Sequence, residues 1–375
     1  MAQKRVRVGV IFGGRSGEHE VSIRSARGVL SALDPARFEP VLIGIDRAGR
    51  WQACDSRALL GAPGTDEAVG QGALVPTSAA SAIAPPSDRS LASQFAVDVF
   101  VPLVHGTYGE DGTLQGLLEM AGAAYVGSGV LGSSVGMDKD VSKRLLRDAG
   151  LPVVDYLVTR RSARLRSPQA EALFEERVEA ELGFPCFVKP ANMGSSVGVY
   201  KVKRRAELAA ALDGASQYDH KVLVERGIDA REIEVAVLGN DEPEASVPGE
   251  IVPTHEFYSY ESKYIDENGA SLLVPAPLDP IEAREVQGLA VRAFQALELE
   301  GLARIDFFLE RGTGRWFVNE VNTLPGFTEI SMYPRLWQAS GLSYRDLVTR
   351  LIELAVERFE RRRTLSVERR LPSAT

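Results

Sequence analysis

Two segments near the C-terminus carry the residues best suited to hold a metal ion. They read ARIDFF over 303–308 and FVNEVN over 317–322. Alternate side chains of a strand share a face, so a hairpin between them sets Asp306 roughly opposite Glu320 and Arg304 near Asn322. Two carboxylates and an amide offer the oxygen ligands that suit Mg²⁺ together with substrate phosphates. We interpret Asp306, Glu320 and Asn322 as a magnesium site; the alternative is a sheet face with unconnected charges.

A lysine followed by a Gly/Ser loop is the second constellation. The segment FVKPANMGSSVG (187–198) places Lys189 in an expected strand and Ser195 and Ser196 in the loop after it. Small residues let backbone N–H groups approach phosphate oxygens, and the hydroxyls add donors. The segment is not a Walker A loop, because the lysine precedes the glycines. Phosphate binding and an ordinary hairpin are both compatible with it.

The strand expected over 221–226 leads into charged residues suited to a nucleotide. The backbone after Glu225 can pair with an adenine edge, and Glu232 can bind ribose hydroxyls. A solvated charged loop explains these residues at least as well when they are taken alone.

Two glycine-containing turns follow expected strands in the N-terminal region. They are GGRSGEHEVS (13–22) and HGTYGEDG (105–112). Ligands of open α/β sheets bind beyond the carboxyl ends of the strands, so both turns can face one crevice. Their glycine spacing does not match G-x-G-x-x-G, which argues against a dehydrogenase. Glu20 is alternatively a simple first-turn acid, and His105 is as readily structural as functional.

The composition is that of a folded protein. The chain has 375 residues, 45% of them hydrophobic and 25% charged, which suggests two to three domains. A net charge of -8 offers no basic footprint for nucleic acid, and no apolar run reaches the roughly 18 residues of a membrane helix. Two cysteines are too few for a disulfide framework. We expect no nucleic-acid or membrane partner and a cytoplasmic location.

Hydrophobic periodicity predicts three α/β regions, which we bound as domains 1–138, 139–240 and 241–375. Strands are expected over 5–12, 40–46, 97–104, 123–126, 185–189, 197–202, 221–226, 231–238, 303–310 and 316–322. Helices are expected over 21–33, after Gly112, over 139–149 with Asp138 as N-cap, and over 281–298 and 344–362. We expect surface loops over 61–93, 159–169 and 255–271.

Eight segments in order resemble the D-alanine–D-alanine ligases of the ATP-grasp superfamily. They are FGGRSGEHEVS (12–22), HGTYGEDGTLQGLLE (105–119), MDK (137–139), FVKPANMGSSVG (187–198), VLVE (222–225), YSYESKY (258–264), ARIDFF (303–308) and NEVNTLPGFTEISMYP (319–334). They span almost the whole chain, so the resemblance is specific. It implies a three-domain ATP-grasp fold of the α/β class, α+β in its ATP-binding part, with an N-terminal open parallel α/β domain.

The resemblance also implies a nucleotide and metal site. Lys139 and Lys189 would bind ATP phosphates, Glu225 and the backbone of Arg226 to Ile228 would hold adenine, and Glu232 would hold ribose. Ser195, Ser196, Phe257 and Phe308 would complete the nucleotide site. Asp306, Glu320 and Asn322 would ligate two Mg²⁺ ions, or Mn²⁺ in their place, with Glu320 bridging. Activation by a monovalent cation such as K⁺ is a trait of the family.

The amino-acid site follows from the same resemblance. Glu20 would pair with the ammonium of a first D-alanine, and His105 would lie near its carboxylate. The N–H groups of Ser331 and Met332, with Lys263, would receive the carboxylate of a second D-alanine. Arg304 and the N–H of Gly326 would form an oxyanion hole. Ser195 and Tyr264 would hydrogen-bond with Glu20 and pin the 255–271 loop over the site.

The implied activity is ATP-dependent synthesis of D-alanyl-D-alanine through an acylphosphate, for peptidoglycan precursors, by a homodimer. A ligase that joins D-alanine to D-lactate or D-serine is the nearest alternative, and Tyr264 favours the dipeptide. A nucleotide-binding module without catalysis is the other alternative, and the intact set of metal ligands argues against it. Many relatives have lysine where Arg226 stands, and the 61–93 stretch matches no motif.

Overall fold

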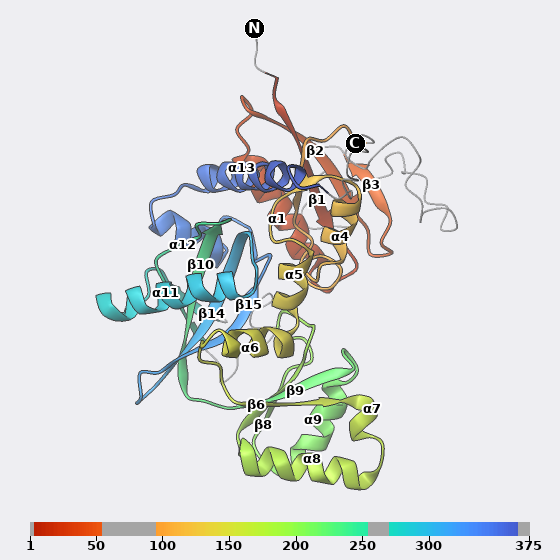
Figure 1. Ribbon diagram of the computed structural model, residues 1–375, viewed down its shortest axis with the longest axis vertical. Coiled ribbons are helices and arrows are strands. Elements are labelled where there is room, and N and C mark those ends of the chain that lie inside the picture. Colours follow the sequence, from red (N-terminus) through yellow and green to blue (C-terminus); the bar gives the residue numbers. More distant parts are fainter. Residues whose placement is uncertain (1–3, 55–94, 254–269, 367–375) are drawn as a thin grey trace, which may run out of the picture.

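The computed structural model describes residues 4–54, 95–253 and 270–366, and their strands form three sheets (Figure 1). In Figure 1 a five-stranded sheet lies at the top, a six-stranded sheet in the middle and a four-stranded sheet at the bottom. Phe257, Lys263 and Tyr264, most of the 255–271 loop and the whole 61–93 stretch lie outside the described residues.

The N-terminal sheet is an open, mainly parallel α/β sheet, as expected. Its order is β3-β2-β1-β4-β5, and only the β3 edge is antiparallel among the described strands. The strands are β1 (Val6–Gly13), β2 (Phe38–Ile45), β3 (Trp51–Cys54), β4 (Val99–Pro102) and β5 (Ala124–Tyr125). Val10 and Ile11 are both fully buried and belong to different apolar clusters, so both faces of the sheet are covered. The helices of this region are α1 (His19–Ala32), α4 (Thr113–Met120) and α5 (Val130–Met137).

The four-stranded sheet is antiparallel and has the order β6-β9-β7-β8. Its strands are β6 (Tyr156–Arg160), β7 (Cys186–Pro190), β8 (Tyr200–Val202) and β9 (Lys221–Arg226). Its helical segments are α7 (Arg161–Arg164), α8 (Pro168–Glu181), η2 (Arg205–Glu207) and α9 (Leu208–Ala215).

The expected surface loop over 159–169 is wrong. These residues hold the end of β6, helix α7 and the start of α8, which Ser167 caps. Arg164 is buried because its guanidinium pairs with Glu171 and Asp213. Basic residues indicate a solvated surface only when no carboxylate neutralises them in the fold.

The C-terminal sheet has the order β13-β12-β10-β14-β15, with β11 paired to β10. Its strands are β10 (Ala230–Gly239), β11 (Glu244–Ala245), β12 (Gly249–Pro253), β13 (Ala270–Leu273), β14 (Gly301–Glu310) and β15 (Trp316–Asn322). Strand β10 pairs with β14 from Ala230 to Gly239. The sheets therefore change between Arg226 and Ala230, before the boundary that we expected near residue 240.

Four further helices connect these layers. They are α6 (Lys139–Asp148), α11 (Pro280–Ala296), α12 (Met332–Ala339) and α13 (Tyr344–Arg363). Asp138 caps α6 as expected, by accepting from the N–H groups of Asp140 and Val141. Helix α13 belongs to the same apolar cluster as β1, and Arg358 donates to the carbonyls of Tyr125 and Gly127. Within the described residues, no helix is long and apolar enough to span a membrane.

Candidate active site

The β14–β15 hairpin brings the four expected polar residues together. Asp306 pairs with Glu320, and Arg304 pairs with Asn322, which confirms the expected register. The register shifts between Asp306 and Phe307, so that Phe307 pairs with Val318 and Asn319 is the extra residue. Between Arg304 and Asp306 the pairing is regular, and alternate side chains of a strand share a face. One face therefore carries Arg304, Asp306, Glu320 and Asn322.

Arg304 and Asp306 form a two-pronged ion pair within β14. Arg304 Nε lies 2.7 Å from Asp306 Oδ1, and Nη2 lies 2.7 Å from Oδ2. Asn322 Nδ2 donates to Asp306 Oδ2 at 2.9 Å. Burial alone would lower the pKa of Arg304, but the carboxylates of Asp306 and Glu234 hold it well above its ordinary value. The guanidinium is therefore a fixed positive charge.

The donor set of the hairpin fits magnesium better than a softer metal. Asp306, Glu320 and Asn322 all offer oxygen atoms. Among the described residues, no three His, Cys, Asp or Glu side chains are grouped to hold a metal ion by themselves. Mg²⁺ is commonly held by one or two carboxylates and completed by phosphate and water, so this incomplete protein set matches that ion when a nucleotide is present.

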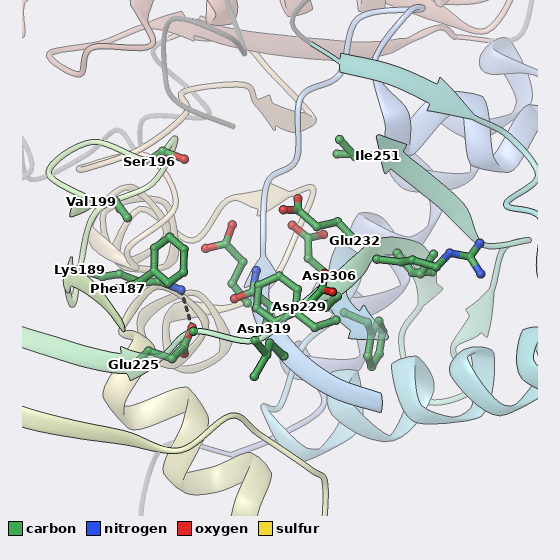
Figure 2. A pocket seen from close by; sticks show the side chains of 18 of the residues that line it. Phe187, Lys189, Ser196, Val199, Glu225, Asp229, Glu232, Ile251, Asp306 and Asn319 are labelled. Carbon is green, nitrogen blue, oxygen red and sulfur yellow. Dashed lines mark hydrogen bonds and ion pairs between the residues drawn. The ribbon is translucent and has the colours of Figure 1, made fainter. Parts of the chain in front are cut away.

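A cavity of about 550 Å³ lies between the four-stranded and the six-stranded sheets. Figure 2 shows Phe187, Lys189 and Glu225 of one sheet facing Glu232 and Asp306 of the other. The expected nucleotide residues that line it are Lys139, Lys189, Ser196, Glu225, Arg226, Ile228, Glu232 and Phe308. A cavity of this size between two sheets accommodates a nucleotide.

Glu225 is the centre of a buried ionic cluster beside this cavity. Its Oε1 lies 2.6 Å from Lys189 Nζ, and its Oε2 lies 2.6 Å from Lys143 Nζ (Figure 2 shows the Lys189 pair). Burial alone would raise the pKa of Glu225, but the two ammonium groups lower it to about 2. Our sequence reasoning missed Lys143. Its position four residues after Lys139 on the expected helix was the available signal, because such residues share a helix face.

A second cavity of about 410 Å³ adjoins the first on the N-terminal side. Both cavities are lined by Lys139 and Glu320, and Lys139 Nζ lies 3.7 Å from Glu320 Oε2. The expected amino-acid-site residues that line the second cavity are His105, Ser195, Arg304, Gly326, Ser331 and Met332. Asn322 lines it as well. The two cavities therefore meet where the metal and phosphate ligands are expected.

The expected contact between Ser195 and Glu20 is wrong. Ser195 Oγ donates instead to Glu18 Oε1 at 2.5 Å, and Glu18 lines the second cavity. Glu20 Oε1 accepts from Arg47 Nη2 at 2.9 Å, and Glu20 is not among the residues that line either cavity described above. Helix α1 begins at His19, and two residues of an α-helix rotate a side chain by roughly 200°. The side chains of Glu18, before the helix, and Glu20, in its first turn, therefore point in different directions.

The Gly/Ser loop spans both cavities. Ser195 lines the second cavity and Ser196 the first, and both have left-handed backbone angles, with φ of 52° and 58°. Lys139 Nζ donates to the carbonyl of Met193 at 2.6 Å, which fixes one end of the loop to α6. Such a conformation costs about 1–2 kcal/mol per non-glycine residue and is typical of functional loops.

His105 and Glu110 connect the N-terminal loop to the segment after β15. His105 Nδ1 lies 3.0 Å from the carbonyl oxygen of Leu324, and burial lowers the pKa of the ring. Glu110 accepts from the N–H of Gly106 at 2.5 Å, and its carbonyl accepts from Thr323 Oγ1 at 3.2 Å. Burial, and then the charge of Glu18, raise the pKa of the Glu110 carboxyl to about 8. Our sequence reasoning did not single out Glu110 or Glu18, although both lie in the quoted turns.

Two family models match the chain. The model described as D-ala D-ala ligase N-terminus matches residues 7–128, and the model described as D-ala D-ala ligase C-terminus matches residues 145–353. A Chromobacterium violaceum protein named D-alanine--D-alanine ligase A is 54% identical over 360 residues, which cover 94% of this chain and 96% of that relative.

Two solved structures of ligases are also similar to this chain. The structure of the D-alanine-D-alanine ligase from Coxiella burnetii matches with a TM-score of 0.82 and 37% identity, over 96% of this chain and 97% of that one. The VanG D-Ala:D-Ser ligase from Enterococcus faecalis matches with a TM-score of 0.78 and 31% identity, over 94% of this chain and 100% of that one.

Proposed function

Because the chain belongs to the D-alanine–D-alanine ligase family, we propose that it joins two D-alanines into D-alanyl-D-alanine, with ATP converted to ADP and phosphate. Its fold is the ATP-grasp architecture of that family. The observation that carries the proposal is the junction of the two cavities at Lys139 and Glu320, where a nucleotide phosphate and an amino-acid carboxylate would meet. The product is a peptidoglycan precursor.

The first step activates a carboxylate. A carboxylate oxygen of the first D-alanine attacks the γ-phosphorus of ATP, the bond to the β-phosphate oxygen breaks, and ADP leaves. Positioning and charge neutralisation dominate such transfers. Lys139 and Lys189 supply positive charge, and Lys189 must turn from Glu225 toward the phosphates. Mg²⁺ held by Asp306, Glu320 and Asn322, or Mn²⁺ in its place, would neutralise further phosphate charge.

The second step forms the peptide bond. The uncharged amine of the second D-alanine attacks the acyl carbon, the bond between that carbon and the phosphate oxygen breaks, and phosphate leaves with the proton that the amine loses. Arg304 and the N–H of Gly326 stabilise the tetrahedral oxyanion, and one such donor is typically worth about 3–4 kcal/mol. The N–H groups of Ser331 and Met332, together with Lys263, receive the second carboxylate. The loop that carries Lys263 and Tyr264 excludes the water that would hydrolyse the acylphosphate.

The first substrate is oriented by Glu18 and His105. The position of Glu18 beside Ser195 in the second cavity supports Glu18, in place of Glu20, as the partner of the D-alanine ammonium. His105 lies near the first carboxylate. In the nucleotide cavity, Glu225 and the backbone of Arg226 to Ile228 hold adenine, Glu232 holds ribose, and Ser196, Phe257 and Phe308 complete the site.

Three further properties belong to the same proposal. We infer a homodimer through the N-terminal region, supported by the exposed apolar side chains of Leu117 and Met120 on α4 and of Leu131 on α5. A cytoplasmic location follows from the need for ATP, and a monovalent cation such as K⁺ raises the activity. Light scattering tests the dimer, and assays with K⁺ replaced by a bulky organic cation test the cation.

The experiment that tests the function is phosphate release from Mg-ATP with product masses recorded. The substrates are D-alanine, L-alanine, D-alanine with D-lactate, and D-alanine with D-serine. Release with D-alanine alone and a dipeptide mass support the proposal. A dominant D-alanyl-D-serine product, the activity for which the Enterococcus relative is named, would overturn the assignment of the second subsite. Nucleotide binding without release under any condition would indicate a module without catalysis.

A further inference from the structure

Three carboxylates stand in one row across the C-terminal sheet. Glu234 of β10 pairs with Asp306 of β14, and Asp306 pairs with Glu320 of β15. The Glu234 side chain is only 5% exposed, and Glu234 lines both cavities. The reaction proposed for this chain assigns roles to Asp306 and Glu320 but none to Glu234. A buried carboxylate is costly unless a partner compensates it.

The guanidinium of Arg304 is an ion-pair partner of Glu234. Glu234 Oε2 lies 3.0 Å from Arg304 Nε, the same nitrogen that lies 2.7 Å from Asp306 Oδ1. The Arg304 guanidinium therefore forms ion pairs with both Glu234 and Asp306. The Arg304 side chain is 18% exposed, so its position depends on these partners more than on water.

Asp306 and Glu234 have different roles in the proposed reaction. Asp306 must present oxygen atoms to Mg²⁺, whereas both of its oxygens contact Arg304 in this structure. A guanidinium that loses this partner without a substitute would be a poorly compensated buried charge, and it would move. Glu234 is already in contact with the same nitrogen and is not needed as a phosphate or amino-acid ligand.

We propose that Glu234 is a positioning residue, which holds Arg304 in the acyl-transfer site when Asp306 turns to the metal ion. This inference rests on the proposed function. Glu234 acts through Arg304 and does not touch the substrate. Its removal changes the placement of the oxyanion donor, and placement errors of about 1 Å cost up to roughly a hundred-fold in rate.

The test compares Glu234→Gln with the wild type and with Glu300→Gln as a matched control. Gln keeps the size of the side chain and removes the charge. Glu300 is also paired with arginines, Arg358 and Arg361, but lies outside both cavities. We expect kcat for dipeptide synthesis to fall about ten- to a hundred-fold in Glu234→Gln. We expect KM for ATP to stay within about two-fold of wild type, because Arg304 acts at the acyl carbon. We expect the Mg²⁺ concentration for half-maximal rate to rise and the calorimetric affinity for Mg-ADP to fall, because Arg304 then competes with Mg²⁺ for Asp306.

A double-mutant cycle with Arg304→Lys shows whether Glu234 acts through Arg304. If it does, Glu234→Gln changes kcat by less than about three-fold in the Arg304→Lys background, because coupled residues are not additive. Additive losses would overturn the proposal. If Glu234→Gln does not fold, Glu234→Asp replaces it in the cycle, since it keeps the charge and shifts the carboxylate by one methylene.

Other results of these measurements would contradict the role of Glu234 or the proposed function. An unchanged kcat in Glu234→Gln, or an equal loss in Glu300→Gln, would show that Glu234 does not position Arg304. A raised Mg²⁺ requirement with full kcat at saturating Mg²⁺ would make Glu234 a metal ligand and overturn the proposal. Failure of the wild type to form dipeptide would refute the proposed function itself, and this is measured first.

Discussion

Glu110→Gln should change how the stability of the protein depends on pH. Glu110 lies in the turn that begins at His105, and burial, then the charge of Glu18, raise the pKa of its carboxyl to about 8, against an ordinary value of 4.5. Between pH 4.5 and about 8, the Glu110 carboxyl is therefore protonated in the folded state and ionised in the unfolded state. Stability contributed by this group is complete below about pH 4.5 and is lost as pH rises toward 8.

The size of the effect follows from the two pKa values. The difference between about 8 and 4.5 corresponds to at most roughly 5 kcal/mol in the free energy of unfolding. Gln carries no charge at any pH and keeps an oxygen that can accept from the N–H of Gly106. The variant should match the wild type at pH 5 and be more stable by about 2–5 kcal/mol at pH 9.

The assay is urea unfolding followed by tryptophan fluorescence at half-unit pH steps from 5 to 9. Glu119→Gln is the control. Burial alone would raise the pKa of Glu119, but hydrogen bonds from Arg362 and Tyr125 lower it, so this group stays ionised throughout the window. Its replacement should shift the curve by a constant amount. Parallel curves for wild type and Glu110→Gln would refute the reasoning, because they would show that Glu110 is ionised in the fold at pH 5.

The remaining predictions concern the metal, the nucleotide and a helix cap. Glu320→Gln should lower kcat at least about a hundred-fold with an unchanged circular dichroism spectrum, since it weakens a metal ligand; near-normal turnover would contradict the assignment. Lys143→Met leaves Glu225 with one lysine, so we expect about 1–3 kcal/mol less stability in urea and weaker calorimetric binding of Mg-ADP; unchanged affinity would separate the cluster from the nucleotide site. Asp138→Ala should lose about 1–2 kcal/mol of stability in urea through the cap of α6, and Asp138→Asn should recover part of it; equal losses would assign the effect to the ion pair with Lys221.

Strand alternation made the pairing of Asp306 with Glu320 in the β14–β15 hairpin predictable. The period of two is fixed by backbone geometry, and a short turn fixes the register, so Asp306 and Glu320 could be placed opposite each other from the sequence. The same rule could have found Glu234, which lies two residues after Glu232 in an expected strand. The extra residue at Asn319 was not predictable, because a bulge leaves no mark in the hydrophobic pattern.

Helical sites were harder to predict because they depend on where the helix begins. Glu18 and Glu20 are both acids beside a glycine turn, and only the start of α1 at His19 separates their directions. Arg164 illustrates a second limit. Its burial is decided by Glu171 and Asp213, of which Asp213 is far away in the sequence, and no local pattern encodes that pairing.

The chain enters the four-stranded sheet after Asp155 and leaves it at Arg226, and these two residues are neighbours in space. Arg226 N donates to the carbonyl of Asp155 at 3.0 Å, and the bridge between Val153 and Val318 anchors the incoming segment to β15. Residues 156–225 are thus an insertion with adjacent ends, visible as the lower lobe in Figure 1. No strand pair joins this module to either of the other sheets among the described residues, so its placement depends on side-chain contacts such as Lys143 with Glu225 and Ser195 with Glu18. Adjacent chain ends are also the arrangement in which folds tolerate the insertion of a module.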